Sequence, residues 1–282
     1  IGIATGAPLP AGCDTVVPHE LTVRGDPLRF TADPPEFGAN VHRRAADAQR
    51  GQILIDAGQR LSAAEIGIAA MAGHRSLLVR ARPRVAVLTS GDEVVPAGTD
   101  PADHQIRNSN DPMVAMLIHR SGGQCVLHRH LADDPDEVRA SIDNAAEHAD
   151  VLVTTGGISA GRHDFLPEAF ERLGCSWRIS GVAMKPGKPV RVGDLNGTAV
   201  VCLPGNPVSA LVTASIFLTP ILRRMLGLTP GPRWRMVRLS QPLRSNPHRT
   251  LLRPAHMLEA DTATVPEWQG SGDLVHLAGT RG

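Results

Sequence analysis

The chain has 282 residues, 42% of them hydrophobic and 3% aromatic, and its formal net charge at pH 7 is +1. This length predicts about two domains, and the near-zero charge and few aromatic side chains argue against a protein that coats nucleic acid or an anionic membrane. The four cysteines form no CxxC pair, so we expect neither a zinc ribbon nor a disulfide framework.

The N-terminal part of the chain, residues 1–44, is rich in proline and glycine with short apolar runs, which predicts a small β-rich piece. A helix is predicted over 62–72, where Ser62 and Glu65 form a capping box and Gly73 follows the last turn. No signal-peptide pattern opens the chain, and no apolar run is expected to reach the ~20 residues of a membrane span. We therefore expect a soluble protein of a reducing compartment that starts part-way through its gene.

From residue 84 onward, strand and helix patterns alternate. Strands are predicted at 84–89, 125–130, 151–155 and 198–203. Helices are predicted at 112–121 with Asp111 as its cap, at 136–148 with Asp134 as its cap and Glu137 completing a capping box, at 165–173 and at 207–226. This alternation predicts an α/β domain with three layers, in which helices cover both faces of a mostly parallel sheet.

After Gly227 the sequence becomes rich in proline and arginine, with strand candidates at 236–240, 250–253 and 256–258. The expected organisation has four parts: a partial β-rich domain (1–44), a partial helical linker domain (45–82), the α/β domain (83–228) and a C-terminal β domain that is truncated (229–282). The α/β part has 13 basic and 16 acidic residues, whereas the last part has 7 and 4. That division fits an anion held at the junction of the two parts, although a solvated surface is the more ordinary reason for it.

Four predicted loops follow strands and precede helices, where a parallel sheet places its ligands. They span residues 89–93, 131–135, 154–161 and 203–209, and the last contains Pro204, Gly205, Asn206, Pro207 and Ser209. The third loop carries Gly156, Gly157 and Gly161 between the hydroxyl residues Thr155 and Ser159. Glycines let backbone N–H groups close on an anion, but the loop matches neither a Walker A nor a GxGxxG pattern, and a tight turn remains an alternative.

Carboxylates and lysines add to this group of candidate residues. Glu93, Asp133 and Asp164 lie on three of the loops, as an oxygen-ligand Mg²⁺ site requires, although Asp164 can equally cap the helix at 165. Of the 29 basic residues only Lys185 and Lys188 are lysines, and they lie three positions apart. Unless this is chance, it indicates a site that needs compact ammonium groups. An anion cradle, a divalent cation and cationic counter-charge are the elements of phosphoryl or adenylyl chemistry.

Five motifs in the same order carry a resemblance to a known family. They are Thr5–Pro10 (TGAPLP), Ser90–Glu93 (SGDE), Thr155–Ser159 (TGGIS), Lys185–Pro189 (KPGKP) and Leu203–Ala210 (LPGNPVSA). The chain resembles molybdopterin molybdenumtransferase, the MoeA and gephyrin E-domain family. The resemblance implies a MogA-like molybdopterin-binding domain with flanking β-rich domains, and an enzyme that converts adenylylated molybdopterin and molybdate to molybdenum cofactor and AMP. It also implies Mg²⁺ or another divalent cation, a homodimer and a cytoplasmic location.

The resemblance also assigns roles to particular residues. It implies catalytic roles for Thr5, Asp47, Glu93, Asp133 and Asp164, with Asp133 and Asp164 also as metal ligands. It implies substrate contacts by the prolines of the fourth loop, and molybdate contacts by Lys185, Lys188, Arg253 and Ser271. Arg253 and Ser271 do not stand out from spacing alone.

Three departures from the family pattern accompany the resemblance. The family's longer N-terminal region, with its Ser-Ala-Met-Asp-Gly segment, does not precede Ile1, Gly181 stands where the family often carries lysine, and Gly282 precedes the family's usual last strands. Two other functions stay open: a molybdopterin-binding or scaffolding module without turnover, and an adenylyl-transfer enzyme that consumes ATP.

Overall fold

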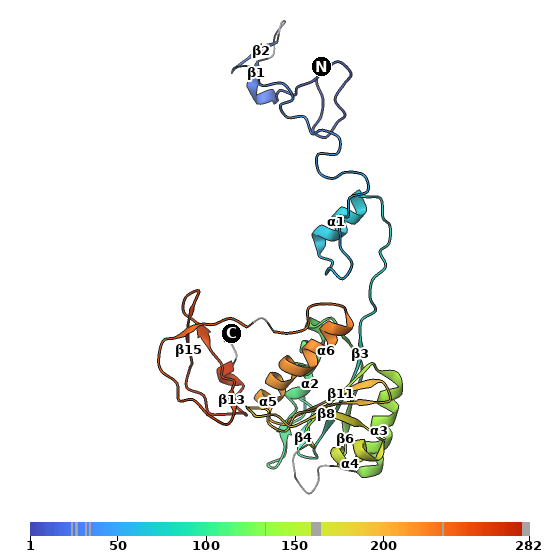
Figure 1. Ribbon diagram of the computed structural model, residues 1–282, viewed down its shortest axis with the longest axis vertical. Helices are drawn as coiled ribbons and strands as arrows, with labels where there is room; N and C mark the ends of the chain where they lie inside the picture. Colours follow the sequence, from blue (N-terminus) through green and yellow to red (C-terminus); the bar gives the residue numbers. More distant parts are fainter. Residues whose placement is uncertain are drawn as a thin grey trace. The chain divides into compact units, whose positions relative to one another are not determined.

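The structure is a computed structural model that describes residues 1–23, 25, 28–31, 33, 35–132, 134–158, 165–232 and 234–277. The chain divides into two compact units, Ile1–Gly73 and His74–Gly282 (Figure 1).

The N-terminal unit contains little regular structure. A short 3₁₀ helix (His19–Leu21) precedes an antiparallel pair of two-residue strands, β1 (Thr22–Val23) and β2 (Arg29–Phe30). The predicted helix is present as α1 (Ala63–Met71), and its capping box is confirmed: the Ser62 Oγ accepts from the Ala64 N–H at 3.3 Å, and the Glu65 carboxylate accepts from the Ser62 N–H at 2.7 Å. Among the described residues of this unit, Ala69 alone is buried.

A six-stranded sheet forms the centre of the second unit, with strand order β6-β3-β7-β11-β10-β8. The first four strands run parallel, whereas β10 is antiparallel to both of its neighbours. The mostly parallel sheet is therefore confirmed, but the sequence patterns did not predict β8 and β10. The strand bounds are β3 Arg84–Ser90, β6 Gln124–Leu131, β7 Val151–Thr155, β8 Ser176–Ser180, β10 Arg191–Leu195 and β11 Thr198–Leu203.

Helices cover both faces of this sheet, as predicted. On one side lie α3 (Pro135–His148) and α4 (Leu166–Arg172), and on the other side lie α2 (Asn110–Arg120), α5 (Pro207–Thr213) and α6 (Thr219–Met225) (Figure 1). Two aliphatic clusters fill the spaces between the layers. Leu88, Ile142 and Phe170 belong to the first cluster, and Val87, Ile118 and Leu218 belong to the second; all six are fully buried.

The last long helical run of the chain has three consecutive parts: α5, a π-helical turn (Ala214–Leu218) and α6. By length and composition alone, the 19-residue run Pro207–Met225 is long and apolar enough to cross a membrane, although polar residues and two arginines interrupt its apolar residues. Ala210, Ala214, Leu218 and Leu222 are fully buried in the core of the unit. Packing against the sheet thus accounts for the apolar composition of the helix, as it does for core helices generally.

Two helix starts differ from the predictions. Asp134 caps α3 as expected, because its Oδ1 accepts from the N–H groups of Asp136 and Glu137 at 3.0 and 2.8 Å. Glu137 does not complete a capping box; its carboxylate accepts instead from the Arg129 guanidinium at 3.1 Å. Asp111 is not the cap of α2, which begins at Asn110.

Asp111 lies inside the first turn of α2, where its carboxylate lies 2.8 Å from the Nε2 of His128. The residue at the N-cap position is Ser109, which makes no capping hydrogen bond through its side chain.

Short strands surround the main sheet. β4 (Val94–Val95) pairs with β5 (Ile106–Arg107), and β9 (Met184–Lys185) pairs with β13 (Thr250–Leu251), both in parallel. A three-stranded sheet of β12 (Arg238–Leu239), β15 (Thr262–Thr264) and β14 (His256–Met257) follows, and a 3₁₀ turn spans Val275–Leu277. Each of the three strand candidates after Gly227 therefore contains a short strand, whereas β15 was not predicted.

Candidate functional site

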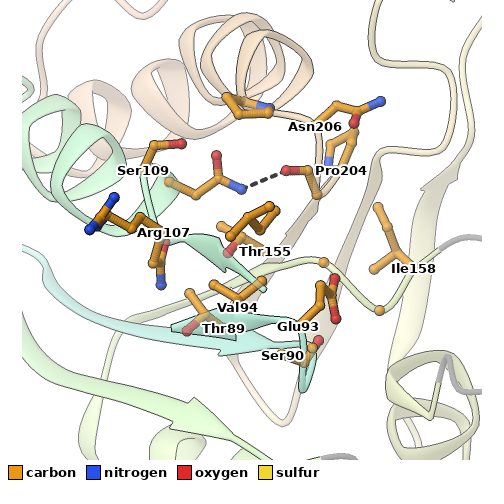
Figure 2. A pocket seen from close by; sticks show the side chains of 18 of the residues that line it. Thr89, Ser90, Glu93, Val94, Arg107, Ser109, Thr155, Ile158, Pro204 and Asn206 are labelled. Carbon is orange, nitrogen blue, oxygen red and sulfur yellow. Dashed lines mark hydrogen bonds between the residues drawn. The ribbon is translucent and has the colours of Figure 1, made fainter. Parts of the chain in front are cut away.

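A cavity of about 580 Å³ opens at the carboxyl ends of β3, β7 and β11. Three of the four predicted loops contribute to its wall (Figure 2). The lining residues are Thr89, Ser90, Gly91, Glu93, Val94, Ile106, Arg107, Asn108, Ser109, Asn110, Thr155, Gly156, Gly157, Ile158, Pro189, Pro204, Gly205, Asn206 and Pro207. Parallel strands place their carboxyl ends at one edge, so loops distant in sequence meet there.

Two glycines allow the loops of β3 and β7 to approach closely. Gly156 and Gly157 have φ angles of +85° and +60°. A Cβ on Gly156 would lie 2.8 Å from the Ser90 carbonyl oxygen, and one on Gly157 would lie 2.7 Å from the Ser90 Oγ. The Gly156 N–H also donates to the Leu203 carbonyl at 3.2 Å, which ties this loop to the end of β11. Only glycine fits both the backbone conformation and the space.

The segment Arg107–Asn110 forms part of the wall that sequence reasoning missed. The parallel pairing of β4 with β5, with Val94 opposite Ile106, places this segment beside the loop after β3. The Asn110 side chain then donates from Nδ2 to the Gly205 carbonyl at 2.8 Å, drawn as a dashed line in Figure 2. The consecutive residues Asn108, Ser109 and Asn110 resemble the start of an ordinary helix. The sequence therefore gave no pattern that indicates a binding site here.

Among the described residues that line this cavity, Glu93 is the carboxylate and Arg107 is the cation. The guanidinium of Arg107 is held by two contacts: it donates to the Thr99 carbonyl at 3.0 Å and to the Asp100 Oδ1 at 2.9 Å. One charge of each sign on a wall of hydroxyls, amides and glycines suits a ligand that has both polar and apolar parts.

A second cavity of about 360 Å³ has a more cationic wall. Its lining residues are Lys185, Arg244, Ser245, Asn246, Pro247, His248, Leu251, Leu252, Arg253 and Trp268. Pairing of β9 with β13 puts Leu251 opposite Lys185, and the Leu252 N–H donates to the Lys185 carbonyl at 2.9 Å. This non-local pairing brings Lys185 and Arg253 to one cavity.

A short segment of chain links the walls of the two cavities within the second unit. Lys185 lines the second cavity and Pro189 lines the first, and four residues of chain limit the separation of their Cα atoms to about 14 Å. The C-terminal segment also reaches the first cavity, because Asn206 donates from Nδ2 to the Ser271 Oγ at 3.0 Å and the Val208 N–H donates to the Ser271 carbonyl at 3.0 Å.

Several predicted site residues lie elsewhere. Lys188 is exposed and Ser209 is buried in α5, and neither belongs to the wall of these two cavities. Thr5 and Asp47 are exposed residues of the N-terminal unit, where the Asp47 Oδ2 lies 2.9 Å from the His42 Nε2.

Asp133, Ser159, Gly161 and Asp164 lie outside the described residues. Within the described part of the chain, no group of three or more histidine, cysteine, aspartate or glutamate side chains could hold a metal ion. Asp133 and Asp164, the two predicted Mg²⁺ ligands, lie outside this part of the chain, so the metal site stays a prediction.

The fold and the cavities define a class of protein: an α/β protein with a cavity of small-molecule size at the carboxyl ends of its parallel strands. Comparison with known proteins narrows this class. Residues 86–224 match the family described as "Probable molybdopterin binding domain", and residues 1–73 match "MoeA N-terminal region (domain I and II)". The chain belongs to the MoeA family of molybdenum cofactor biosynthesis proteins.

Individual relatives agree with this family. The chain is 37% identical over 238 residues to molybdopterin molybdenumtransferase 2 of Mycobacterium tuberculosis, covering 82% of this chain and 58% of the relative. It is 29% identical to the molybdopterin molybdenumtransferase of Staphylococcus aureus, and the match covers 99% of this chain and 67% of the relative. A crystal structure of the molybdopterin biosynthesis MoeA protein of Pyrococcus horikoshii superimposes with a TM-score of 0.75 at 29% identity. The match covers 99% of this chain and 69% of that chain. The chain thus spans about three fifths to two thirds of the length of these relatives.

Proposed function

We propose that this chain transfers molybdenum from molybdate to adenylylated molybdopterin and releases AMP. The observation that carries the proposal is the pair of cavities whose walls are linked by the segment Lys185–Pro189. One cavity has the size and lining of an organic-ligand site, and the other has the positive charge that an oxyanion requires. Two reactants held on either side of one short segment can react without diffusing apart.

The first cavity is suited to the adenylylated pterin. Its volume lies in the range of small-molecule sites, about 300–1,000 Å³. Val94, Ile106 and Ile158 offer apolar surface to flat rings, whereas the glycine loop and Arg107 offer N–H groups and positive charge to phosphate. The loop residues Thr155, Gly156, Gly157 and Pro204–Pro207 were predicted as substrate contacts, and their place on this wall supports that prediction.

The second cavity is suited to molybdate. Lys185, Arg244 and Arg253 bring three cationic side chains to one wall, and a dianion is attracted by their combined field. Ser271, predicted as a further molybdate contact, is hydrogen-bonded to Asn206 of the first cavity. This supports a position for Ser271 between the two ligands.

A divalent cation would be held by carboxylates and substrate phosphate oxygens. Glu93 supplies a carboxylate to the first cavity, and the predicted Asp133 and Asp164 would add to it, which fits the one or two carboxylates that Mg²⁺ prefers. When bound, Mg²⁺ would neutralise charge on the phosphoanhydride. Asp134 has another role, because its Oδ1 caps α3.

The protein groups that line the two cavities bind and orient the two reactants. Backbone N–H groups of the glycine loop and the Arg107 guanidinium hold the phosphates, so the leaving AMP is fixed while its phosphoanhydride bond breaks. The cations of the second cavity hold the oxyanion until the dithiolene of the pterin captures the metal. Catalysis then rests on preorganised charge, because little covalent chemistry falls to the protein. A homodimer and a cytoplasmic location remain predictions that rest on the resemblance alone.

The test is AMP release from adenylylated molybdopterin by the purified chain, measured by chromatography with and without molybdate. We expect AMP to appear in proportion to the cofactor formed, and only when molybdate is present. A chain that binds the adenylate and retains it with molybdate present would be a binding or scaffolding module instead. Consumption of ATP that does not depend on molybdate would indicate adenylyl transfer.

A further inference from the structure

Trp268 brings an aromatic side chain to the wall of the second cavity. It is half-buried, and so are Leu251 and Leu252 on the same wall, so solvent reaches all three residues. The Trp268 Nε1–H donates to the Asp273 carbonyl at 3.3 Å, which limits how the indole can turn. The second cavity therefore combines accessible apolar side chains with its cationic ones.

The volume of this cavity exceeds what an oxyanion needs. At about 360 Å³ it lies within the range of about 300–1,000 Å³ that is typical of sites for small organic molecules. A single tetrahedral oxyanion would fill only a small part of it, and the apolar side chains would stay in contact with water. Volume and lining together indicate room for an organic group beside the oxyanion.

The wall restricts the chemistry of that organic group. An indole pairs well with another flat ring, since aromatic pairs gain energy beyond the area that they bury. Ser245, Asn246 and His248 are exposed side chains on the same wall, and they can exchange hydrogen bonds with the polar edge of a ring. These features suit a flat heterocycle that lies next to an anion.

The loop that carries Trp268 also reaches the first cavity. Ser271 follows three positions later, and its Oγ accepts from the Nδ2 of Asn206, a residue on the wall of the first cavity, at 3.0 Å. A group bound against Trp268 therefore lies on the same loop as the hydrogen bond to the first cavity.

The proposed substrate has two flat heterocycles, adenine and pterin, and the metal transfer distinguishes them. The dithiolene that captures the metal belongs to the pterin part, so this part must reach the oxyanion when the metal–sulfur bonds form. We infer that the pterin ring packs against Trp268 in the second cavity, beside the oxyanion. This inference rests on the proposed function and refines it, because it assigns the pterin end of the substrate to the second cavity and the adenylate end to the first.

Calorimetric titration of the full chain with free pterin, AMP and molybdate tests the inference. Removal of an aromatic partner weakens the binding of a stacked ring by about fivefold or more, and we expect this loss of pterin affinity in Trp268→Ala. Affinities for AMP and for molybdate should stay unchanged in this variant, because the adenylate lies in the other cavity and the oxyanion is held by the cations.

Three further variants separate contact with the ring from support of the loop. Trp268→Phe keeps an aromatic face but lacks the N–H that donates to Asp273, and it should retain most of the pterin affinity. Trp234→Ala, which removes a tryptophan that is 74% exposed, is the control and should bind pterin like the unmodified chain. If Trp268→Ala does not fold, Trp268→Leu replaces it, because it keeps apolar volume without an aromatic face.

The outcomes separate the inference from the function on which it rests. Unchanged pterin affinity in Trp268→Ala, an equal loss in Trp268→Phe, or a loss of AMP affinity instead would each overturn the role of Trp268 in binding the pterin ring. Failure of the unmodified chain to bind pterin would overturn it as well. Pterin binding that depends on Trp268, without AMP release that depends on molybdate, would overturn the proposed function and leave a pterin-binding module.

Discussion

At the scale of single residues, the first cavity depends on how closely its loops can approach one another. Gly157 shows this most clearly, because both its backbone conformation and its surroundings exclude a side chain. A Cβ at this position would lie 2.7 Å from the Ser90 Oγ and 2.9 Å from the Leu166 Cδ1. Gly197, in the turn between β10 and β11, has a similar positive φ of +93° but open space around it.

We therefore predict that Gly157→Ala destabilises the chain more than Gly197→Ala does. Backbone strain alone costs about 1 kcal/mol at either position, and overpacking at Gly157 adds about 1–3 kcal/mol. Urea unfolding of both variants measures the difference, and calorimetry with AMP measures the effect on the cavity. Equal losses of stability would show that the Ser90 and Leu166 contacts do not constrain the loop.

The sequence predicted some residues of the candidate site and missed others. The loops after β3, β7 and β11 were predicted because hydrophobic strand runs ending in glycine are local patterns. Arg253 was identified only through the family resemblance, since its position depends on the pairing of β9 with β13, which no local pattern reveals. Asn110 was missed because its neighbours resemble an ordinary helix start, and its place on the wall depends on the pairing of β4 with β5.

At the scale of elements, one ion pair joins the start of β3 to the turn before β7. The Arg84 backbone N–H and guanidinium donate to the two carboxylate oxygens of Asp150 at 2.7 and 3.0 Å, and the Asp150 N–H donates to the Arg84 carbonyl at 2.8 Å. These hydrogen bonds hold the pKa of Asp150 below its ordinary value, and Arg84 has a raised pKa for the same reason.

The lowered pKa of Asp150 predicts a pH dependence of stability. The folded chain binds this proton less readily than the unfolded chain, so the contribution is complete above the ordinary aspartate pKa and is lost as the pH falls through the lower, folded value. The pair is partly exposed, and we expect about 1 kcal/mol or less.

Urea midpoints between pH 7 and pH 2 would test this for the unmodified chain and Asp150→Asn. The variant should be less stable at pH 7 and should lose less stability below about pH 4. Parallel pH curves would mean that the ion pair contributes nothing. Asp143→Asn, on the exposed side of α3, is the control for the loss of one carboxylate.

Element prediction succeeded where caps and periodicity agreed. The bounds of β7 and β11 match the predicted strands, and the Ser62 and Asp134 caps formed as expected. The antiparallel strands β8 and β10 were missed because their alternating, partly exposed residues give a weak apolar signal. Their place in the sheet depends on pairing across the fold, which sequence periodicity does not contain.

At the scale of the whole molecule, burial is distributed unequally between the two units. All five residues of β7 are buried, whereas Ala69 is the one buried residue among those described in Ile1–Gly73. Regions with few buried contacts open with little free energy.

Hydrogen exchange of the full chain should therefore show fast exchange over 1–73 and slow exchange in β3, β7 and β11. Mass spectrometry of peptic peptides measures both regions in one experiment, with α3 as an internal reference for a packed helix. Protection of 1–73 equal to that of β7 would contradict the reading of this unit as sparsely packed.

We propose that the second cavity, with Lys185 and Arg253 on its wall, holds molybdate. Calorimetric titration of the full chain with molybdate tests it, comparing Lys185→Ala and Arg253→Ala with Arg139→Ala, which removes an exposed charge of α3 that pairs only with Asp136 among the described contacts. We predict at least about a tenfold loss of molybdate affinity in the first two variants, unchanged affinity in the third, and unchanged affinity for AMP in all three. Molybdate binding by Lys185→Ala that equals that of the unmodified chain would contradict the account.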